Sequence, residues 1–114
     1  MAKMNRMRAD LVAEIKTARA EAQTKANAFK NLTSKRYESL RAITAVATYN
    51  EVLSMIEWGG TEHKIPDMAA TALSDFEYAH NDDPTATERT LAVAEGRRDA
   101  LASVADWMGK EETA

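Results

Sequence analysis

The chain has 114 residues, 45% hydrophobic and 29% charged, which is enough for one small helical domain and too apolar for general disorder. It contains no cysteine, which excludes disulfides and thiolate chemistry, and no apolar run long enough for a membrane span. The net charge of −3 hides a division, because residues 1–41 carry +6 and residues 42–114 carry −9. We expect the two halves to lie against each other or against a neighbouring subunit.

An apolar residue followed directly by a cation recurs every 11 residues near the start of the chain. The four pairs are Met7-Arg8, Ala18-Arg19, Phe29-Lys30 and Leu40-Arg41. Eleven residues complete about three helical turns, so the repeat predicts one nearly straight helix over residues 4–57, with an apolar seam beside a row of positive charge. Residues 31–34 are the only local sequence that looks like a break, and the unchanged phase on either side favours continuity.

The apolar seam of this long helix is the main candidate interface. A rod cannot cover its own seam, and an uncovered row of large apolar side chains is an interaction site. We therefore expect a homo-oligomer, or a complex with another protein. Alanines in the middle of the seam suit close helix pairing. The predicted interface residues are Met7, Leu11, Ile15, Ala18, Ala22, Phe29 and Leu32.

The end of the long helix should hold the main core, because apolar residues at 49–58 lie all around the helix instead of on one side. Trp58-Gly59-Gly60 predicts a helix stop, since glycine adopts the left-handed conformation without steric cost. Trp58 is expected to close the core above this stop.

Residues 66–109 predict an acidic helical pair, followed by a tail at 110–114. Pro66 suits the first turn of a helix that runs to about His80. Asp83 is a natural N-cap, with Pro84 in the first turn of a final helix that Gly109 ends after Met108. No segment has the alternation of a strand. The predicted fold is therefore a single all-α domain over 1–114, in which two shorter helices pack back on the long one.

The basic row predicted along the long helix consists of Arg8, Arg19, Lys30 and Arg41. Pairing with the acidic half of the chain is the preferred interpretation. Nucleic acid is an alternative partner, although no helix-turn-helix, zinc finger or aromatic stacking platform accompanies the row. A second alternative is an acidic inhibitor that blocks a DNA-binding enzyme. Its candidate residues are Asp75, Glu77, Asp82, Asp83 and Glu88.

The final helical segment carries Asp83-Pro84 and then Glu95-Gly96-Arg97-Arg98-Asp99. Because of these residues, the segment 83–108 resembles small accessory proteins of tailed bacteriophages. The resemblance implies a phage product that binds virion parts or host machinery. Glycine inside a helix costs about 1 kcal/mol relative to alanine, so Gly96 predicts a close helix contact. Arg97 and Arg98 would pair with the acidic surface or bind a partner's carboxylate.

Catalysis and metal binding are not indicated. His63 and His80 lack the spacing of histidine pairs in zinc sites, and no glycine-rich phosphate loop or nucleophile turn is present. We expect no cofactor, no metal and no membrane partner. The sequence favours a non-enzymatic interaction or structural protein, acting in the cytoplasm, or in the host cytoplasm or virion if it is encoded by a phage.

Overall fold

The computed structural model describes the backbone of residues 2–58 and 60–113 and the side chains of residues 9–58 and 60–109. Within these limits the chain is helical, and no strand is present, so the predicted all-α class is confirmed. Two short 3-10 helices, η1 and η2, lie in the connections. The elements are α1 (Ala2–Phe29), η1 (Thr33–Lys35), α2 (Arg36–Trp58), η2 (Glu62–Lys64), α3 (Ile65–Asn81) and α4 (Glu88–Thr113).

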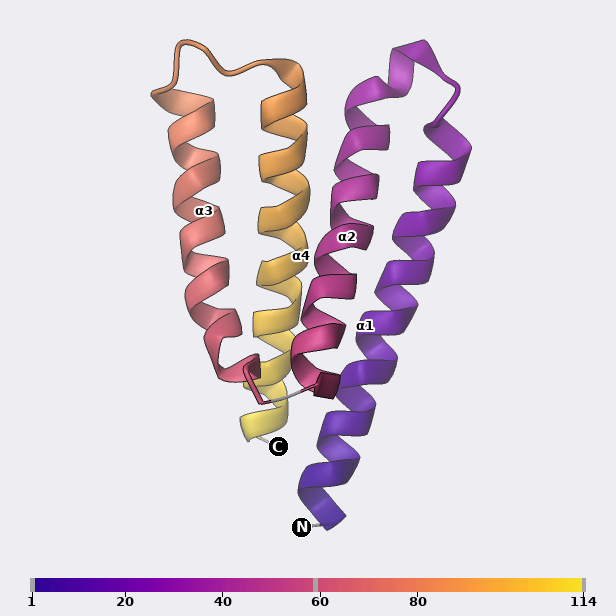
Figure 1. Ribbon diagram of the computed structural model, residues 1–114, viewed down its shortest axis with the longest axis vertical. Helices are drawn as coiled ribbons and strands as arrows, with labels where there is room; N and C mark the ends of the chain where they lie inside the picture. The colour runs from indigo at the N-terminus through magenta and orange to yellow at the C-terminus, as the bar shows by residue number, and fades with distance from the viewer. Residues whose placement is uncertain (1, 59, 114) are drawn as a thin grey trace.

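The four helices form two antiparallel hairpins, α1–α2 and α3–α4. Across the view of Figure 1 the order is α3, α4, α2, α1, so the two inner helices α2 and α4 join the hairpins and run in the same direction. Helix α1 contacts α2 far more extensively than α4, and α3 packs mainly on α4. The protein measures 48 × 31 × 23 Å. Helices α1 and α3 form its two outer edges in Figure 1.

The prediction of one continuous helix over 4–57 was wrong. Helix α1 ends at Phe29, the Leu32 N–H donates to the Phe29 carbonyl at 3.0 Å, and Leu32 itself is extended at φ −102° and ψ 109°. Asn31, Thr33 and Ser34 favour such a turn, because their short polar side chains compete for backbone hydrogen bonds. The apolar phase survives the turn because both α1 and α2 are amphipathic, and phase alone does not distinguish a rod from a hairpin.

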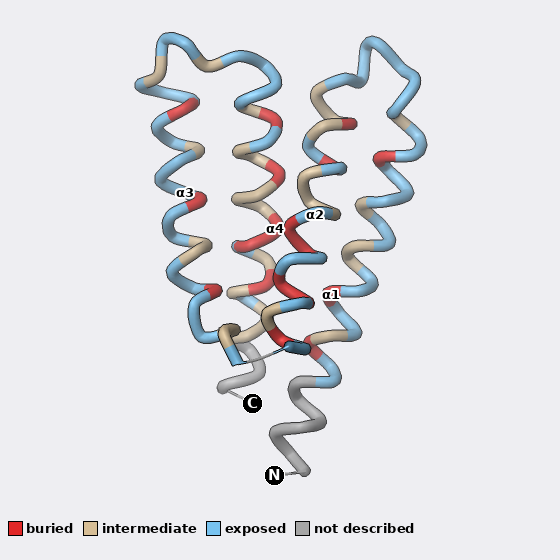
Figure 2. The backbone as a smooth tube through the Cα atoms, in the orientation of Figure 1, coloured by how far each residue is buried: buried red, intermediate tan, exposed pale blue. Residues whose placement is uncertain are grey.

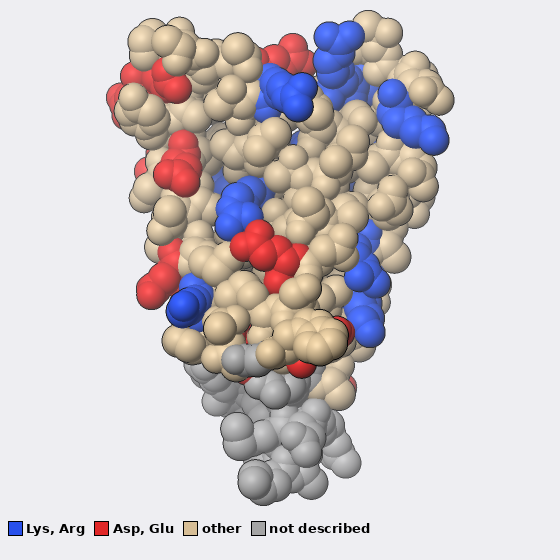
Figure 3. Space-filling model, in the orientation of Figure 1, with Lys and Arg blue, Asp and Glu red and all other residues tan. Residues whose placement is uncertain are grey.

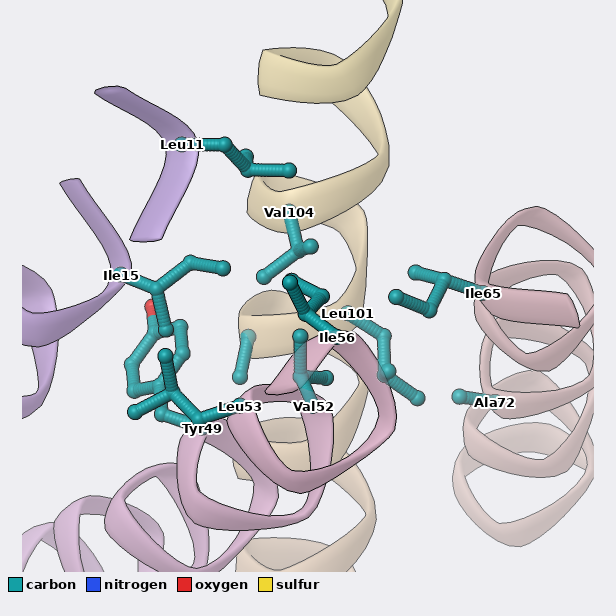
Figure 4. Close-up of a cluster of buried hydrophobic side chains, with 11 residues drawn as sticks. Leu11, Ile15, Tyr49, Val52, Leu53, Ile56, Ile65, Ala72, Leu101 and Val104 are labelled. Carbon is teal, nitrogen blue, oxygen red and sulfur yellow. The ribbon is translucent and has the colours of Figure 1, made fainter. Parts of the chain in front are cut away.

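The core takes buried side chains from all four helices and lies mainly in the half of the molecule opposite the two hairpin tips (Figure 2). Its largest fully buried side chains are Ile15, Val52, Ile65, Leu101 and Val104. Figure 4 shows Ile15 from α1 facing side chains of α2 and α4, while Ile65 from α3 approaches Leu101 on the other side. Burying each such side chain stabilises the fold by about 1.5–3 kcal/mol relative to leaving it exposed.

The expected core at residues 49–58 is confirmed in part. The residues Tyr49, Val52, Leu53 and Ile56 are buried. Trp58, however, is 84% exposed, so the prediction that it closes the core was wrong. Helix α2 does end at Trp58 as predicted, and Gly60 adopts φ 69° in the connection that follows. That conformation is available to glycine without steric cost.

Both predicted ends of the final helix were wrong. Asp83 does not cap α4, because its Oδ1 accepts from the backbone N–H and the hydroxyl of Thr85 at 2.9 and 2.7 Å and so closes a turn around Pro84. Helix α4 begins at Glu88, with the Thr87 hydroxyl accepting from the Thr90 N–H at 3.2 Å. The helix also passes through Gly109 to Thr113.

Candidate interaction surfaces

A groove of about 410 Å³ opens where α1 diverges from α4 toward the hairpin tips, and we call it the α1–α2–α4 groove. Half of its lining residues are small, which allows another helix to come close. Charged side chains of both signs border it. The small and aromatic lining residues include Ala18, Ala22, Phe29, Ala42, Tyr49 and Ala100. Three charged lining residues, Glu21, Lys25 and Glu38, make no ion pair within the described part of the chain.

The predicted interface residues divide between the core and this groove. Leu11 and Ile15 are buried inside the chain, so the prediction that their part of the seam is uncovered was wrong; the hairpin reversal packs it on α2 and α4. Ala18, Ala22 and Phe29 are half-buried and line the groove. The other two predicted residues lie elsewhere, because Leu32 is exposed at the hairpin tip and Met7 lies outside the residues whose side chains are described.

A polar network joins the two hairpins beside the groove, between α2 and α4. The Tyr37 hydroxyl donates to Glu95 Oε2, and Arg41 pairs with Asp99 at 3.2 Å and with Glu95 at 3.6 Å. Arg98 reaches Asp99 at 2.7 Å, and its guanidinium lies 4.0 Å from the centre of the Phe76 ring on α3. The network therefore connects α2, α3 and α4 through the polar ends of their side chains.

The pKa of Tyr37 provides a test of this network. Burial is the main reason that its pKa rises from 10.0 to about 12, and the hydrogen bond to Glu95 adds to the shift. Because the folded state raises this pKa, the neutral phenol contributes stability that is complete below pH 10 and is lost as the pH rises toward 12. We expect Tyr37→Phe to lower the free energy of unfolding by about 1 kcal/mol at neutral pH. We also expect it to reduce the decline in stability above pH 10.

Urea denaturation of both proteins across this pH range measures the two effects. Burial also raises the pKa of Tyr49, so the Tyr37→Phe variant should retain part of the alkaline decline. An unchanged decline in the variant would contradict the assigned role of Tyr37.

The basic row does not form a continuous surface. Arg41 lies on α2 and Arg19 and Lys30 on α1, and the chain reverses between them. Arg41 is engaged by the polar network, and Arg19 donates to Asn50 Oδ1 at 2.9 Å. Lys30 is exposed, and the side chain of Arg8 lies outside the described residues. Pairing within the chain, the preferred interpretation, is confirmed for Arg41.

The close helix contact predicted at Gly96 is confirmed. A Cβ added at this position would lie 2.5 Å from the Arg41 carbonyl oxygen on α2. The adjacent arginines pair with carboxylates of the same chain, as the first of their two interpretations requires. Arg97 contacts Glu51 at 3.0 Å, and Arg98 belongs to the polar network.

A second groove runs between α3 and α4, and we call it the α3–α4 groove. It consists of two adjoining hollows of about 480 and 360 Å³ that share Ala72, Asp75 and Arg97. Met68, Ala72 and Val93 give it an apolar floor, and carboxylates stand along the α3 side. Of the proposed acidic residues, Asp75 and Asp83 line this groove, while Glu77, Asp82 and Glu88 are exposed and do not.

The sequence reasoning missed three features of these surfaces: the role of Tyr37, the groove carboxylate Asp67, and the exposed cations Lys35 and Arg36. A count of charges by segment would have found Asp67, Lys35 and Arg36. Residues 22–37 contain four Lys/Arg and no Asp/Glu, whereas residues 65–88 contain six Asp/Glu and no Lys/Arg.

Within the described ranges, no three His, Asp or Glu side chains are grouped so as to hold a metal ion. None of the described helices is long and apolar enough to cross a membrane. No family model matches this chain, and no curated protein or solved structure shows significant similarity to it.

Proposed function

We propose that this protein is a non-enzymatic interaction protein that associates with a second copy of itself through the face of α1 that lines the α1–α2–α4 groove. The observation that supports this most is the groove, which leaves Ala18, Ala22 and Phe29 partly uncovered. A helix with small side chains fits between three helices because backbones approach closely where side chains are small.

The charges around the groove favour a second copy as its occupant. A two-fold dimer brings the same patch of both copies together, so that patch must complement itself. Lys25 on one copy would face Glu21 or Glu38 on the other, and none of the three has an ion-pair partner in the described chain. The resemblance of residues 83–108 to phage accessory proteins extends the proposal to a virion component or host-factor inhibitor, acting in the host cytoplasm or the virion.

The proposal is tested with a matched pair of variants in α1. Ala22 lines the groove and Ala20 is exposed outside it, so Ala22→Glu and Ala20→Glu add the same charge to opposite settings. In sedimentation equilibrium at about 0.5 M salt, which screens exposed charges, the wild type and Ala20→Glu should dimerise. Burying an unpaired carboxylate at the interface should make dimerisation of Ala22→Glu more than about tenfold weaker.

A wild type that stays monomeric at every concentration would contradict the proposal. Equal weakening by Ala20→Glu and Ala22→Glu would also contradict it, because the effect would then not depend on the groove.

The nucleic-acid alternative has less support. Two of the four basic-row residues have partners inside the chain, Arg41 with carboxylates and Arg19 with Asn50, and the carboxylates offset the charge of Arg41. An acidic inhibitor of a DNA-binding enzyme remains a second proposal, supported by the carboxylates along α3, which make no ion pair with the side chains of residues 9–58 and 60–109. Excess DNA should compete with it for the captured enzyme.

A further inference from the structure

Two segments of opposite charge occupy opposite edges of the molecule. The tip of the α1–α2 hairpin lies within residues 22–37, whose charged residues are all Lys or Arg. Helix α3 and the loop after it lie within residues 65–88, whose charged residues are all Asp or Glu. On the face shown in Figure 3, Asp and Glu atoms are most frequent along the α3 edge, and Lys and Arg atoms are most frequent at the tip and outer edge of the α1–α2 hairpin. Charged atoms of both signs also lie in the middle of this face, and one group of Lys or Arg atoms lies at the lower end of the α3 edge. The charge division of the sequence is therefore also a division in space.

These charges do not neutralise each other inside the chain. We define the basic tip as Lys30, Leu32, Lys35 and Arg36, all exposed. The ion pairs between side chains of residues 9–58 and 60–109 link α1 to α2, link α2 to α4 or lie within α4, and none includes a cation of the basic tip or a carboxylate from residues 65–88. The expected pairing of the two halves thus occurs between α1 and α2 and between α2 and α4, and the charges of the basic tip and of residues 65–88 are exposed to a neighbouring molecule.

The basic tip and the α3–α4 groove also complement each other in polarity. Leu32, 49% exposed, stands between Lys30 and Lys35 in the sequence, so the tip presents an apolar side chain flanked by cations. The groove presents apolar residues that include Val93, 41% exposed, with Asp67 and Asp75 along the α3 side. Lys64 and Arg97 also line the groove, and Arg97 is paired with Glu51 at 3.0 Å. Asp67 and Asp75 are eight residues apart on α3, or about 12 Å by the helical rise. With this spacing, two cations of one tip can each pair with one of the two carboxylates.

We propose that the basic tip of one copy docks in the α3–α4 groove of the next copy. The contact joins two different surfaces, so it is head-to-tail and leaves a free tip and a free groove at the two ends of every assembly. Such contacts build open chains unless the rotation between copies closes a ring. This surface is separate from the α1–α2–α4 groove, so the inference does not depend on the two-fold dimer.

The salt dependence of mass in solution gives the first test. At about 0.02 M salt, light scattering of the full chain should show assemblies larger than a dimer that grow with protein concentration. At about 0.5 M salt the exposed charges are screened and these assemblies should dissociate. A mass that is the same at both salt concentrations overturns the proposal, whether that mass is a monomer or a closed dimer.

A reciprocal charge exchange gives the sharper test. The tip variant carries Lys30→Glu, Lys35→Glu and Arg36→Glu, and the groove variant carries Asp67→Lys and Asp75→Lys. Each alone should associate about tenfold more weakly at low salt, since its tip and groove then repel. An equimolar mixture should recover the large assemblies, because each tip then meets a groove of opposite charge. A mixture no larger than its components overturns the proposal.

Two controls connect the result to this contact. Glu77 is exposed on α3 but does not line the groove, so Glu77→Lys should retain assembly, whereas Asp75→Lys, with the same change in charge, should weaken it. Ala22→Glu should retain the salt-dependent growth even if it abolishes the two-fold dimer. If circular dichroism shows that a charge variant is unfolded, the salt series on the wild type decides the question.

Discussion

Replacing Ile15 by alanine is expected to lower the free energy of unfolding by about 2–5 kcal/mol, the range for large-to-small substitutions in well-packed cores. Ile15 is fully buried and belongs to the cluster in which α1, α2 and α4 meet (Figure 4). Removal of the side-chain atoms beyond Cβ leaves a cavity, which the surrounding helices cannot fill completely by moving inward. A domain of this size is stable by only about 5–15 kcal/mol, so a substantial share of the total would be lost.

Ile43 gives the matched control, because it is 49% exposed on α2 and Ile43→Ala should cost well under about 1 kcal/mol. Urea denaturation at two protein concentrations measures both variants. The loss for Ile15→Ala should be independent of concentration, since the side chain is buried within one chain. If instead Ile15→Ala were as mild as Ile43→Ala, α1 would not be packed on its own chain as described.

The position of Ile15 also explains which part of the fold could be predicted from the sequence. Apolar periodicity correctly predicted helices, and the glycines after Trp58 correctly predicted the end of α2. Periodicity did not reveal the reversal at residues 30–35, because a hairpin whose two helices remain in phase has the same pattern as a rod. The burial of Leu11 and Ile15 within the chain distinguishes the hairpin from the rod, and burial depends on tertiary contacts.

Helix ends near polar residues were predicted least well. Asp83 and Thr87 are both suitable N-caps by residue type, and the choice between them depends on the turn that Asp83 closes with Thr85. The charged surfaces could also be predicted only in part. The charge of each segment is visible in the sequence, but the sequence does not show which charged residues form ion pairs within the chain. Arg41 and Lys30 occupy equivalent places in the 11-residue repeat, yet Arg41 is held by Glu95 and Asp99 while Lys30 is exposed.

The contact between the two hairpins depends on the absence of a side chain at one position of α4. At Gly96, α4 approaches α2 so closely that a Cβ would lie 2.5 Å from the Arg41 carbonyl oxygen and 3.0 Å from Thr44 Cβ. A carbonyl oxygen of a helix cannot move without displacing the whole turn. The same approach places Arg41 beside Glu95 and Asp99, so the polar network depends on the spacing that Gly96 permits.

Gly96→Ala is therefore expected to lower the free energy of unfolding by about 1–3 kcal/mol, the usual cost of overpacking a close contact. This loss should occur even though alanine is favoured over glycine inside a helix by about 1 kcal/mol. Gly109→Ala, in the same helix, meets nothing within 4 Å and should raise the free energy of unfolding by up to about 1 kcal/mol. Urea denaturation of the two variants should thus give effects of opposite sign. Stabilisation by both substitutions would mean that α2 and α4 are further apart in solution, and the network of Tyr37, Arg41, Glu95, Arg98 and Asp99 could not then form as described.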